Sequence, residues 1–131
     1  MNRFAQFTAA VAVLALVHGT PVGAVPPGQV SGTAASTCDY RAIAAQHPDP
    51  ALRNPDDLAG RLCPPFFLPR DYDAARDVMD LNPEASAGYY FVNARTRHID
   101  ARLAHAVADG ITQVVVLGAG FDSRAYRFAP R

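Results

Sequence analysis

The sequence predicts an α/β protein in which a helical N-terminal region leads into the first strand of a doubly wound sheet. Residues 114–117 form a run of valine and leucine that is typical of a strand buried on both faces of a parallel sheet. A glycine turn at residues 118–120 follows directly. Before the strand, from residue 36 onward, helix start and stop signals recur.

Length and charge limit the class of protein. The chain has 131 residues, a formal net charge of zero and 50% hydrophobic residues, which suffices for one small domain. Nucleic-acid binding would require clustered basic residues and a basic isoelectric point, so balanced charge gives no electrostatic case for it.

Residues 1–24 have the pattern of an export signal. Arg3 supplies a positive start, residues 9–17 supply an apolar core, and residues 22–24 fit a small-residue cleavage site. The apolar run is too short for a stable membrane span, which needs ~20 residues. Residues 25–37 are rich in Pro, Gly, Ser and Thr and are predicted to be a linker.

The helical region is predicted to cover residues 38–110. A first helix over residues 38–46 would be capped by Ser36 or Thr37, and a second over residues 55–62 by Asn54. Cys38 and Cys63 would pair in an oxidising compartment, adding ~3 kcal/mol of stability, and would be buried thiols in the cytosol.

Two further helices follow. Asp71 is expected to cap a helix over residues 72–81, and Asn82 with Pro83 a long helix ending near residue 108. Gly88 could divide the long helix, and Gly110 should end it.

The long helix carries an apolar stripe with an arginine in it. Phe91, Ile99, Leu103 and Val107 fall largely on one side, and Arg95 lies among them. An arginine on an apolar stripe is costly unless its guanidinium finds an anion, either a protein carboxylate or a ligand, or reaches solvent.

The glycine turn is the strongest ligand-binding signal. Gly118 and Gly120 allow a sharp turn and a close approach to a ligand, at the strand end where α/β sheets bind ligands. A dinucleotide fingerprint would want a third glycine where Ser123 stands. Asp122 could cap a helical turn over residues 123–127 or accept from a bound ligand, while Arg124 and Arg127 are expected to pin the loop or lie at the surface.

Three segments resemble one protein family. QVVVLGAGFDSRAYRF, residues 113–128, closely resembles the first cofactor-binding motif of the leucine carboxyl methyltransferase family. YFVNARTRHID, residues 90–100, is similar to the family's aromatic–Arg–Thr–Arg element, and residues 49–62 resemble its N-terminal region more loosely. The resemblance implies a class I S-adenosylmethionine-dependent methyltransferase with a Rossmann-like sheet behind a helical cap. Residues 111–131 would start its cofactor-binding domain, incomplete in this chain.

The resemblance also implies a site. Gly118, Ala119 and Gly120 would lie against the amino-acid and ribose portion of S-adenosyl-L-methionine, Arg95 would bind its methionine carboxylate, and Asp122 its ammonium. The methyl acceptor would be a small or carboxylate-bearing molecule, methylated on a carboxylate or hydroxyl. No residue stands out as a general base.

A metal site is not expected, because His98 and His105 share a helix face that is more typical of a solvated surface.

An acidic residue at the end of the following strand would be needed to hold the ribose of the cofactor. That strand would come after residue 131. We therefore expect the 131-residue chain alone to be mostly helical, loosely packed and catalytically inactive.

Localisation stays open between two alternatives. An exported enzyme would lack its methyl donor, which is a cytosolic metabolite, whereas translation from a codon such as that of Val25 or Val30 would leave the protein in the cytoplasm. The alternative function is an exported, non-catalytic helical binding protein.

Overall fold

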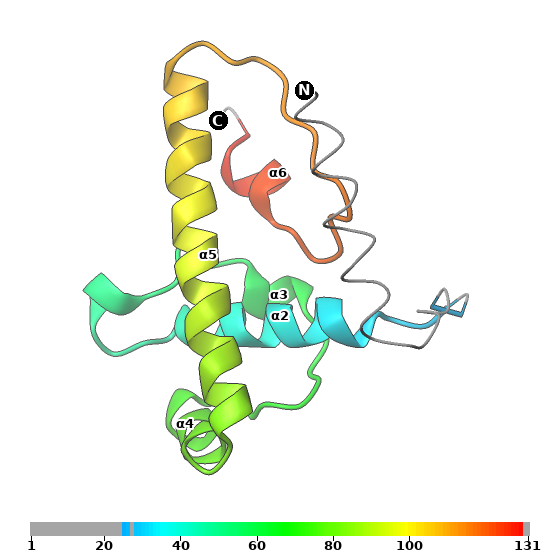
Figure 1. The fold of residues 1–131 in the computed structure, drawn as a ribbon, viewed down its shortest axis with the longest axis vertical. Coiled ribbons are helices and arrows are strands. Elements are labelled where there is room, and N and C mark those ends of the chain that lie inside the picture. The colour runs from blue at the N-terminus through cyan, green and yellow to red at the C-terminus, as the bar shows by residue number, and fades with distance from the viewer. Residues whose placement is uncertain (1–24, 27, 130–131) are drawn as a thin grey trace, which may run out of the picture.

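The computed structural model describes residues 25–26 and 28–129, so the predicted export signal at residues 1–24 lies outside them. All regular secondary structure in the described part is helical. It comprises α2 (Gly32–Ala44), the 3-10 helix η1 (Pro50–Leu52), α3 (Ala59–Leu62), α4 (Tyr72–Asp80), α5 (Pro83–Ala108) and α6 (Arg124–Arg127). In Figure 1, α5 forms the long axis, α2 crosses it, α4 lies near its N-terminal end, and the chain after α5 turns back alongside it.

The caps of α4 and α5 confirm the predicted starts of both helices. The Asp71 side chain accepts a hydrogen bond from the Ala74 amide, and Asn82 accepts from the amides of Glu84 and Ala85. Gly110, with φ of 91°, follows the end of α5 in a conformation that favours glycine.

Gly88 does not divide α5, which is continuous from Pro83 to Ala108, and it lies where α2 packs against α5. A Cβ atom at Gly88 would lie 2.7 Å from the hydroxyl oxygen of Tyr40, which projects from α2. The missing side chain therefore permits the close packing of α2 against α5.

The predicted start of the first helix is wrong. Helix α2 begins at Gly32, within the stretch predicted to be a linker, and Ser31 caps it by accepting from the Ala34 amide at 3.4 Å. The hydroxyl of Thr37 donates to the Thr33 carbonyl at 3.0 Å, so this hydroxyl bonds within the helix rather than breaking it. The high content of Ser and Thr in residues 25–37 therefore wrongly indicated a linker where part of a helix lies.

Helix α3 is shorter than predicted, starting at Ala59 rather than residue 55. The Asn54 side chain accepts from the amide of Asp56 at 2.8 Å, which makes a local turn in place of a helix start. Asp56, only 1% exposed, then points inward to Arg41.

Two clusters of buried residues hold the helices together. The larger joins α2, α4 and the start of α5, with Tyr40 and Tyr72 packed against it, and contains Ile43, Ala44, Leu68, Ala75, Met79, Ala85 and Tyr89. The smaller joins α2 to α3 through Cys38, Ala42, Ala59 and Cys63, and Phe121 packs against it.

The apolar stripe predicted on α5 is not its buried face. Phe91 is 64% exposed and Val107 is 47% exposed, whereas the residues that α5 buries are largely different ones. The buried face consists of Ala85, Tyr89, Val92, Asn93, Thr96 and Asp100. Three of these buried residues are polar and satisfy their polar groups with hydrogen bonds. The spacing of apolar residues in the sequence therefore could not indicate this face.

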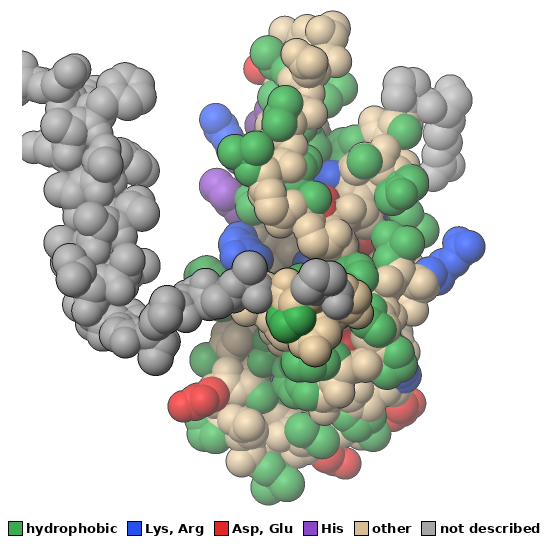
Figure 2. All heavy atoms as spheres, turned by 90° about the vertical axis from the view of Figure 1, so that its right-hand side faces the viewer, with side chains coloured by type: hydrophobic (Ala, Val, Ile, Leu, Met, Phe, Trp, Pro, Cys, Tyr) green, Lys and Arg blue, Asp and Glu red, His purple; other side chains and the backbone are tan. Residues whose placement is uncertain are grey.

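The predicted strand is absent from the described residues. Residues 111–116 have no regular secondary structure, and Leu117 is 89% exposed. A strand needs a neighbour for its backbone groups, and no other described segment pairs with this one. The described part therefore shows the helical region but not the sheet, and Figure 2 shows apolar side chains exposed over the upper part of the molecule.

Candidate cofactor-binding site

A cavity lies between α2, the middle of α5 and the segment that carries the glycine turn. It has a volume of about 910 Å³. All the residues predicted to bind the cofactor line it, namely Arg95, Gly118, Ala119, Gly120 and Asp122. The structure therefore brings together side chains from two segments that the sequence singled out separately.

The glycine turn forms one wall of this cavity. Gly118 and Gly120 have φ angles of 62° and 52°, in the left-handed region that favours glycine. The Asp122 amide donates to the Ala119 carbonyl at 2.9 Å and closes the turn. A Cβ atom at Gly120 would lie 3.2 Å from the Cβ of Ala34 on α2, so the turn also packs closely against the helical region.

Arg95 lines the cavity from α5. Its guanidinium carbon lies 5.6 Å from the centre of the Phe91 ring. Within residues 28–129 no carboxylate lies at ion-pair distance from it. Arg97, two residues on, instead donates a hydrogen bond to the backbone carbonyl of Arg53.

Asp122 is engaged by its own segment. Oδ1 accepts from the Arg124 amide at 2.8 Å, and Oδ2 accepts from Nη1 of Arg124 at 2.5 Å. The structure thus shows the local, capping-type role that the sequence left open beside a ligand-binding one, although the formal cap of α6 is Ser123.

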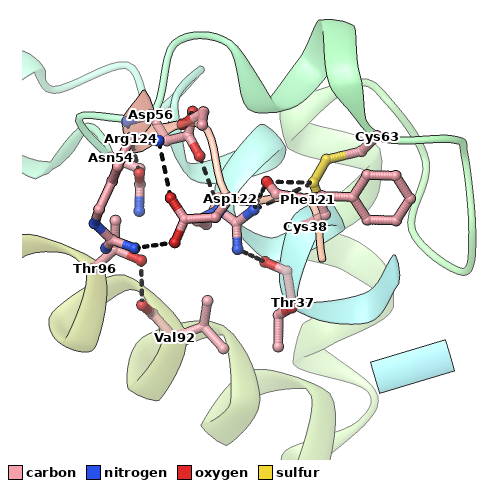
Figure 3. Close-up of polar contacts among 12 residues, drawn as sticks. Thr37, Cys38, Asn54, Asp56, Cys63, Val92, Thr96, Phe121, Asp122 and Arg124 are labelled. Carbon is pink, nitrogen blue, oxygen red and sulfur yellow. Dashed lines mark hydrogen bonds and ion pairs between the residues drawn. A yellow bond between two sulfur atoms is a disulfide. The ribbon is translucent and has the colours of Figure 1, made fainter. Parts of the chain in front are cut away.

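Arg124 and Arg127 pin the segment after the glycine turn, as expected. Arg124 Nε donates to Asp100 Oδ1 at 2.7 Å, and Arg127 Nη1 donates to Asp100 Oδ2 at 2.6 Å. Ser123, itself buried, donates from Oγ to Asp56 Oδ1 at 2.6 Å. Figure 3 shows the contact between Arg124 and Asp122.

A second set of contacts holds the turn from the side of α2. Arg41 Nε donates to Asp56 Oδ2 at 2.9 Å, and Nη2 donates to the Phe121 carbonyl at 2.8 Å. Sequence reasoning missed Arg41, Asp56 and Asp100. Asp56 and Asp100 lie within residues 49–62 and 90–100, which resemble the family. That resemblance was the one feature of the sequence that could have pointed to these two carboxylates.

The two cysteines form a disulfide in the structure. Cys38 and Cys63 have Cα atoms 5.8 Å apart and join α2 to the residue that follows α3. Phe121, the residue that follows the glycine turn, packs against the cluster that contains both cysteines.

His98 and His105 are exposed. No group of three or more His, Cys, Asp or Glu side chains is placed to hold a metal ion among the residues that the structure describes. None of the helices described is both long enough and apolar enough to cross a bilayer.

The cavity combines a glycine wall with a guanidinium that has no ion-pair partner among the described residues, an arrangement suited to a small ligand that carries a carboxylate. The model of the leucine carboxyl methyltransferase family matches residues 34–130, and the chain belongs to this family.

Three relatives carry the name S-adenosyl-L-methionine-dependent methyltransferase. One from Streptomyces coelicolor is 37% identical over 109 residues, covering 80% of this chain and 36% of the relative. One from Frankia alni is 38% identical over 110 residues, covering 80% and 36%. One from Mycolicibacterium paratuberculosis is 38% identical over 107 residues, covering 75% and 33%. The chain thus spans about a third of the length of these relatives. No solved structure matches it.

Proposed function

We propose that this chain forms the helical cap and the cofactor-binding turn of an S-adenosyl-L-methionine-dependent methyltransferase. One observation carries the proposal: Arg95 and the glycine turn, far apart in the sequence, line the same cavity. Family membership and the names of the relatives support the same activity.

Arg95 is the residue proposed to bind the methionine carboxylate of the cofactor. Its guanidinium has five donors in a planar fork that matches a carboxylate. It is exposed to the cavity and has no ion-pair partner among the described residues, so a ligand carboxylate would supply the missing anion.

The turn is proposed to lie against the amino-acid and ribose portion. Glycines at 118 and 120 keep side-chain atoms away from that surface of the cavity. Ser31, which caps α2, and Thr33 and Thr37 of α2 also line the cavity, and their hydroxyl oxygens could accept a hydrogen bond from a polar ligand. Asp122 retains acceptor capacity for an ammonium group beside its bonds to Arg124.

Methyl transfer from a sulfonium is an in-line displacement, so the residues of this chain would act by positioning. We propose O-methylation of a carboxylate or hydroxyl on a small or carboxylate-bearing acceptor. We further propose that the 131-residue chain alone has no methyl-transfer activity, because its cavity wall at residues 114–117 is exposed and unpaired.

Binding of radiolabelled S-adenosyl-L-methionine by equilibrium dialysis tests the proposal. Substituting Arg95→Ala should weaken binding about tenfold or more, because a charge-assisted bidentate contact is worth roughly 1.5–3 kcal/mol. Arg61→Ala is the matched control, since Arg61 is exposed on α3 and does not line the cavity. Equal affinity of the Arg95→Ala variant and the unmodified protein would reject the role of Arg95.

The Cys38–Cys63 disulfide favours a second candidate, a non-catalytic helical binding protein in an oxidising compartment. The dialysis experiment separates the two, because that candidate predicts no binding of S-adenosyl-L-methionine by either the unmodified protein or the variant.

A further inference from the structure

The disulfide lies in direct contact with the residue that ends the glycine turn. Cys38 is fully buried and Cys63 is 7% exposed. Both belong to the cluster on which Phe121 packs, and Phe121 follows Gly120 in the wall of the cavity. The state of the two sulfur atoms therefore bears on the position of the turn.

Arg41 connects the disulfide to the turn through hydrogen bonds. Its Nη2 lies 3.3 Å from Cys38 Sγ and 2.8 Å from the carbonyl oxygen of Phe121. The same guanidinium binds Asp56 through Nε at 2.9 Å. The Arg41 guanidinium thus contacts a sulfur atom, a carbonyl oxygen and a carboxylate. Figure 3 shows the Cys38–Cys63 disulfide and Phe121.

We propose that the Cys38–Cys63 pair is a thiol–disulfide exchange site whose redox state sets how firmly the glycine turn is held, acting through Arg41. The exchange needs a small dithiol as the reductant. Only the consequence for ligand affinity rests on the proposed function, because the effect on the turn follows from contacts within the chain.

The exchange has a defined direction. A thiolate of the dithiol attacks Cys63 Sγ, the more exposed side, and the S–S bond breaks with its electron pair leaving on Cys38 Sγ. The positive charge of Arg41, 3.3 Å away, stabilises the Cys38 thiolate as the leaving group. The second thiolate of the dithiol then attacks the mixed disulfide, releasing Cys63 as a thiolate and the dithiol as a cyclic disulfide. Two electrons pass from the dithiol to the protein.

Reduction should loosen the turn for two reasons. The covalent link between α2 and the end of α3 is lost, which frees the surface on which Phe121 packs. A thiolate at Cys38 is also a stronger acceptor for Arg41 than a neutral carbonyl, so it draws the guanidinium from the Phe121 oxygen.

Amide hydrogen exchange of the purified protein, oxidised and then reduced with a small dithiol, tests the proposal. Alkylation and mass measurement establish the redox state of each sample. We expect amides of residues 120–124 to exchange about tenfold faster after reduction while those in the first half of α5 stay protected. Unchanged exchange at residues 120–124, or equal acceleration throughout α5, would overturn the proposal.

Two variants isolate the contribution of the Cys38 sulfur charge. Cys63→Ser leaves a free Cys38 beside Arg41, whereas Cys38→Ala combined with Cys63→Ser removes both sulfur atoms. Faster exchange at residues 120–124 in the single variant than in the double one is expected, and equal exchange would refute coupling through Arg41. If neither the oxidised nor the reduced form bound S-adenosyl-L-methionine, the proposed function would be refuted and the exchange result would stand.

Discussion

The ion pair between Arg124 and Asp100, with Nε and Oδ1 separated by 2.7 Å, ties the segment after the glycine turn to the middle of α5. Both side chains are largely shielded from solvent, at 14% and 10% exposure. Asp100 also accepts from Arg127 at 2.6 Å, so a single carboxylate holds two arginines of α6. A polar anchor therefore holds this end of the site, in addition to the packing of Phe121 on the smaller buried cluster.

Asp100→Asn should lower the free energy of unfolding by roughly 1.5–3 kcal/mol, because two shielded guanidinium groups each lose a charge-assisted partner. Arg124 keeps Asp122, and Arg127 keeps Asp56 at 3.6 Å, so neither charge is left without a carboxylate. Urea unfolding followed by circular dichroism measures the change. Asp80→Asn is the matched control: its ion pair with Arg76 has a carboxylate 60% exposed, and an exposed helix pair contributes only about 0.3–0.5 kcal/mol. Similar losses in both variants would contradict the anchoring role of Asp100.

Gly88→Ala should destabilise the protein although alanine is the better helix former. The new Cβ would lie 2.7 Å from the Tyr40 hydroxyl oxygen and 2.9 Å from a ring carbon. Tyr40 cannot easily yield, because its ring packs edge-on against Phe67 at 5.3 Å. We expect a net loss of about 1–3 kcal/mol from overpacking, measured as a lower urea midpoint.

Gly60→Ala provides the opposite expectation in the same assay. Gly60 lies in α3, and a Cβ there would meet nothing within 4 Å. The substitution should stabilise the protein by up to about 1 kcal/mol. If Gly88→Ala were as favourable as Gly60→Ala, close packing of α2 on α5 could not explain the glycine.

The sequence predicted what local chemistry decides. The caps at Asp71 and Asn82 and the glycine after α5 could be predicted because a short polar side chain and a missing Cβ act on their own neighbours. That Arg95 and the glycine turn would line one cavity was predicted from the family resemblance and not from the spacing of the residues.

The features that the sequence did not reveal depend on which hydrogen-bond partner a polar group takes, and composition alone does not decide this. Whether a serine- and threonine-rich stretch forms a helix depended on hydroxyls that bond back to their own backbone. The buried face of α5 is polar, and only the folded arrangement shows that Asp100 meets Arg124 and Arg127. The predicted strand needs a partner strand, which sequence periodicity cannot supply.

Alkaline pH should destabilise the protein through Tyr89. Burial, and then the neighbouring Tyr72, raises the pKa of Tyr89 above its ordinary value. Folding then favours the neutral phenol, so this contribution to stability is complete below about pH 10 and is lost as the pH rises toward the folded-state pKa.

Tyr89→Phe should therefore make the free energy of unfolding fall less steeply between about pH 9 and 11. Some slope should remain, because burial and then Asp39 also raise the pKa of Tyr40. Tyr126→Phe is the control, as Tyr126 is 68% exposed. An unchanged slope in Tyr89→Phe would show that Tyr89 does not control the alkaline response.

Gly120→Ala should impair the glycine turn more than Gly118→Ala does. Both glycines have positive φ, which costs a residue with a side chain of order 1 kcal/mol or more. A Cβ at Gly118 meets nothing within 4 Å, whereas one at Gly120 would crowd the Cβ of Ala34 at 3.2 Å. The urea midpoint should therefore fall further for Gly120→Ala, by the additional cost of crowding.

Adding Ala34→Gly to Gly120→Ala removes the crowded atom but not the backbone strain. The second substitution should therefore recover only the part of the loss that crowding causes. The effect of Ala34→Gly is measured in the unmodified protein and in the Gly120→Ala variant. If the urea midpoint changed equally in both, the turn would not be packed against α2 as the contacts indicate.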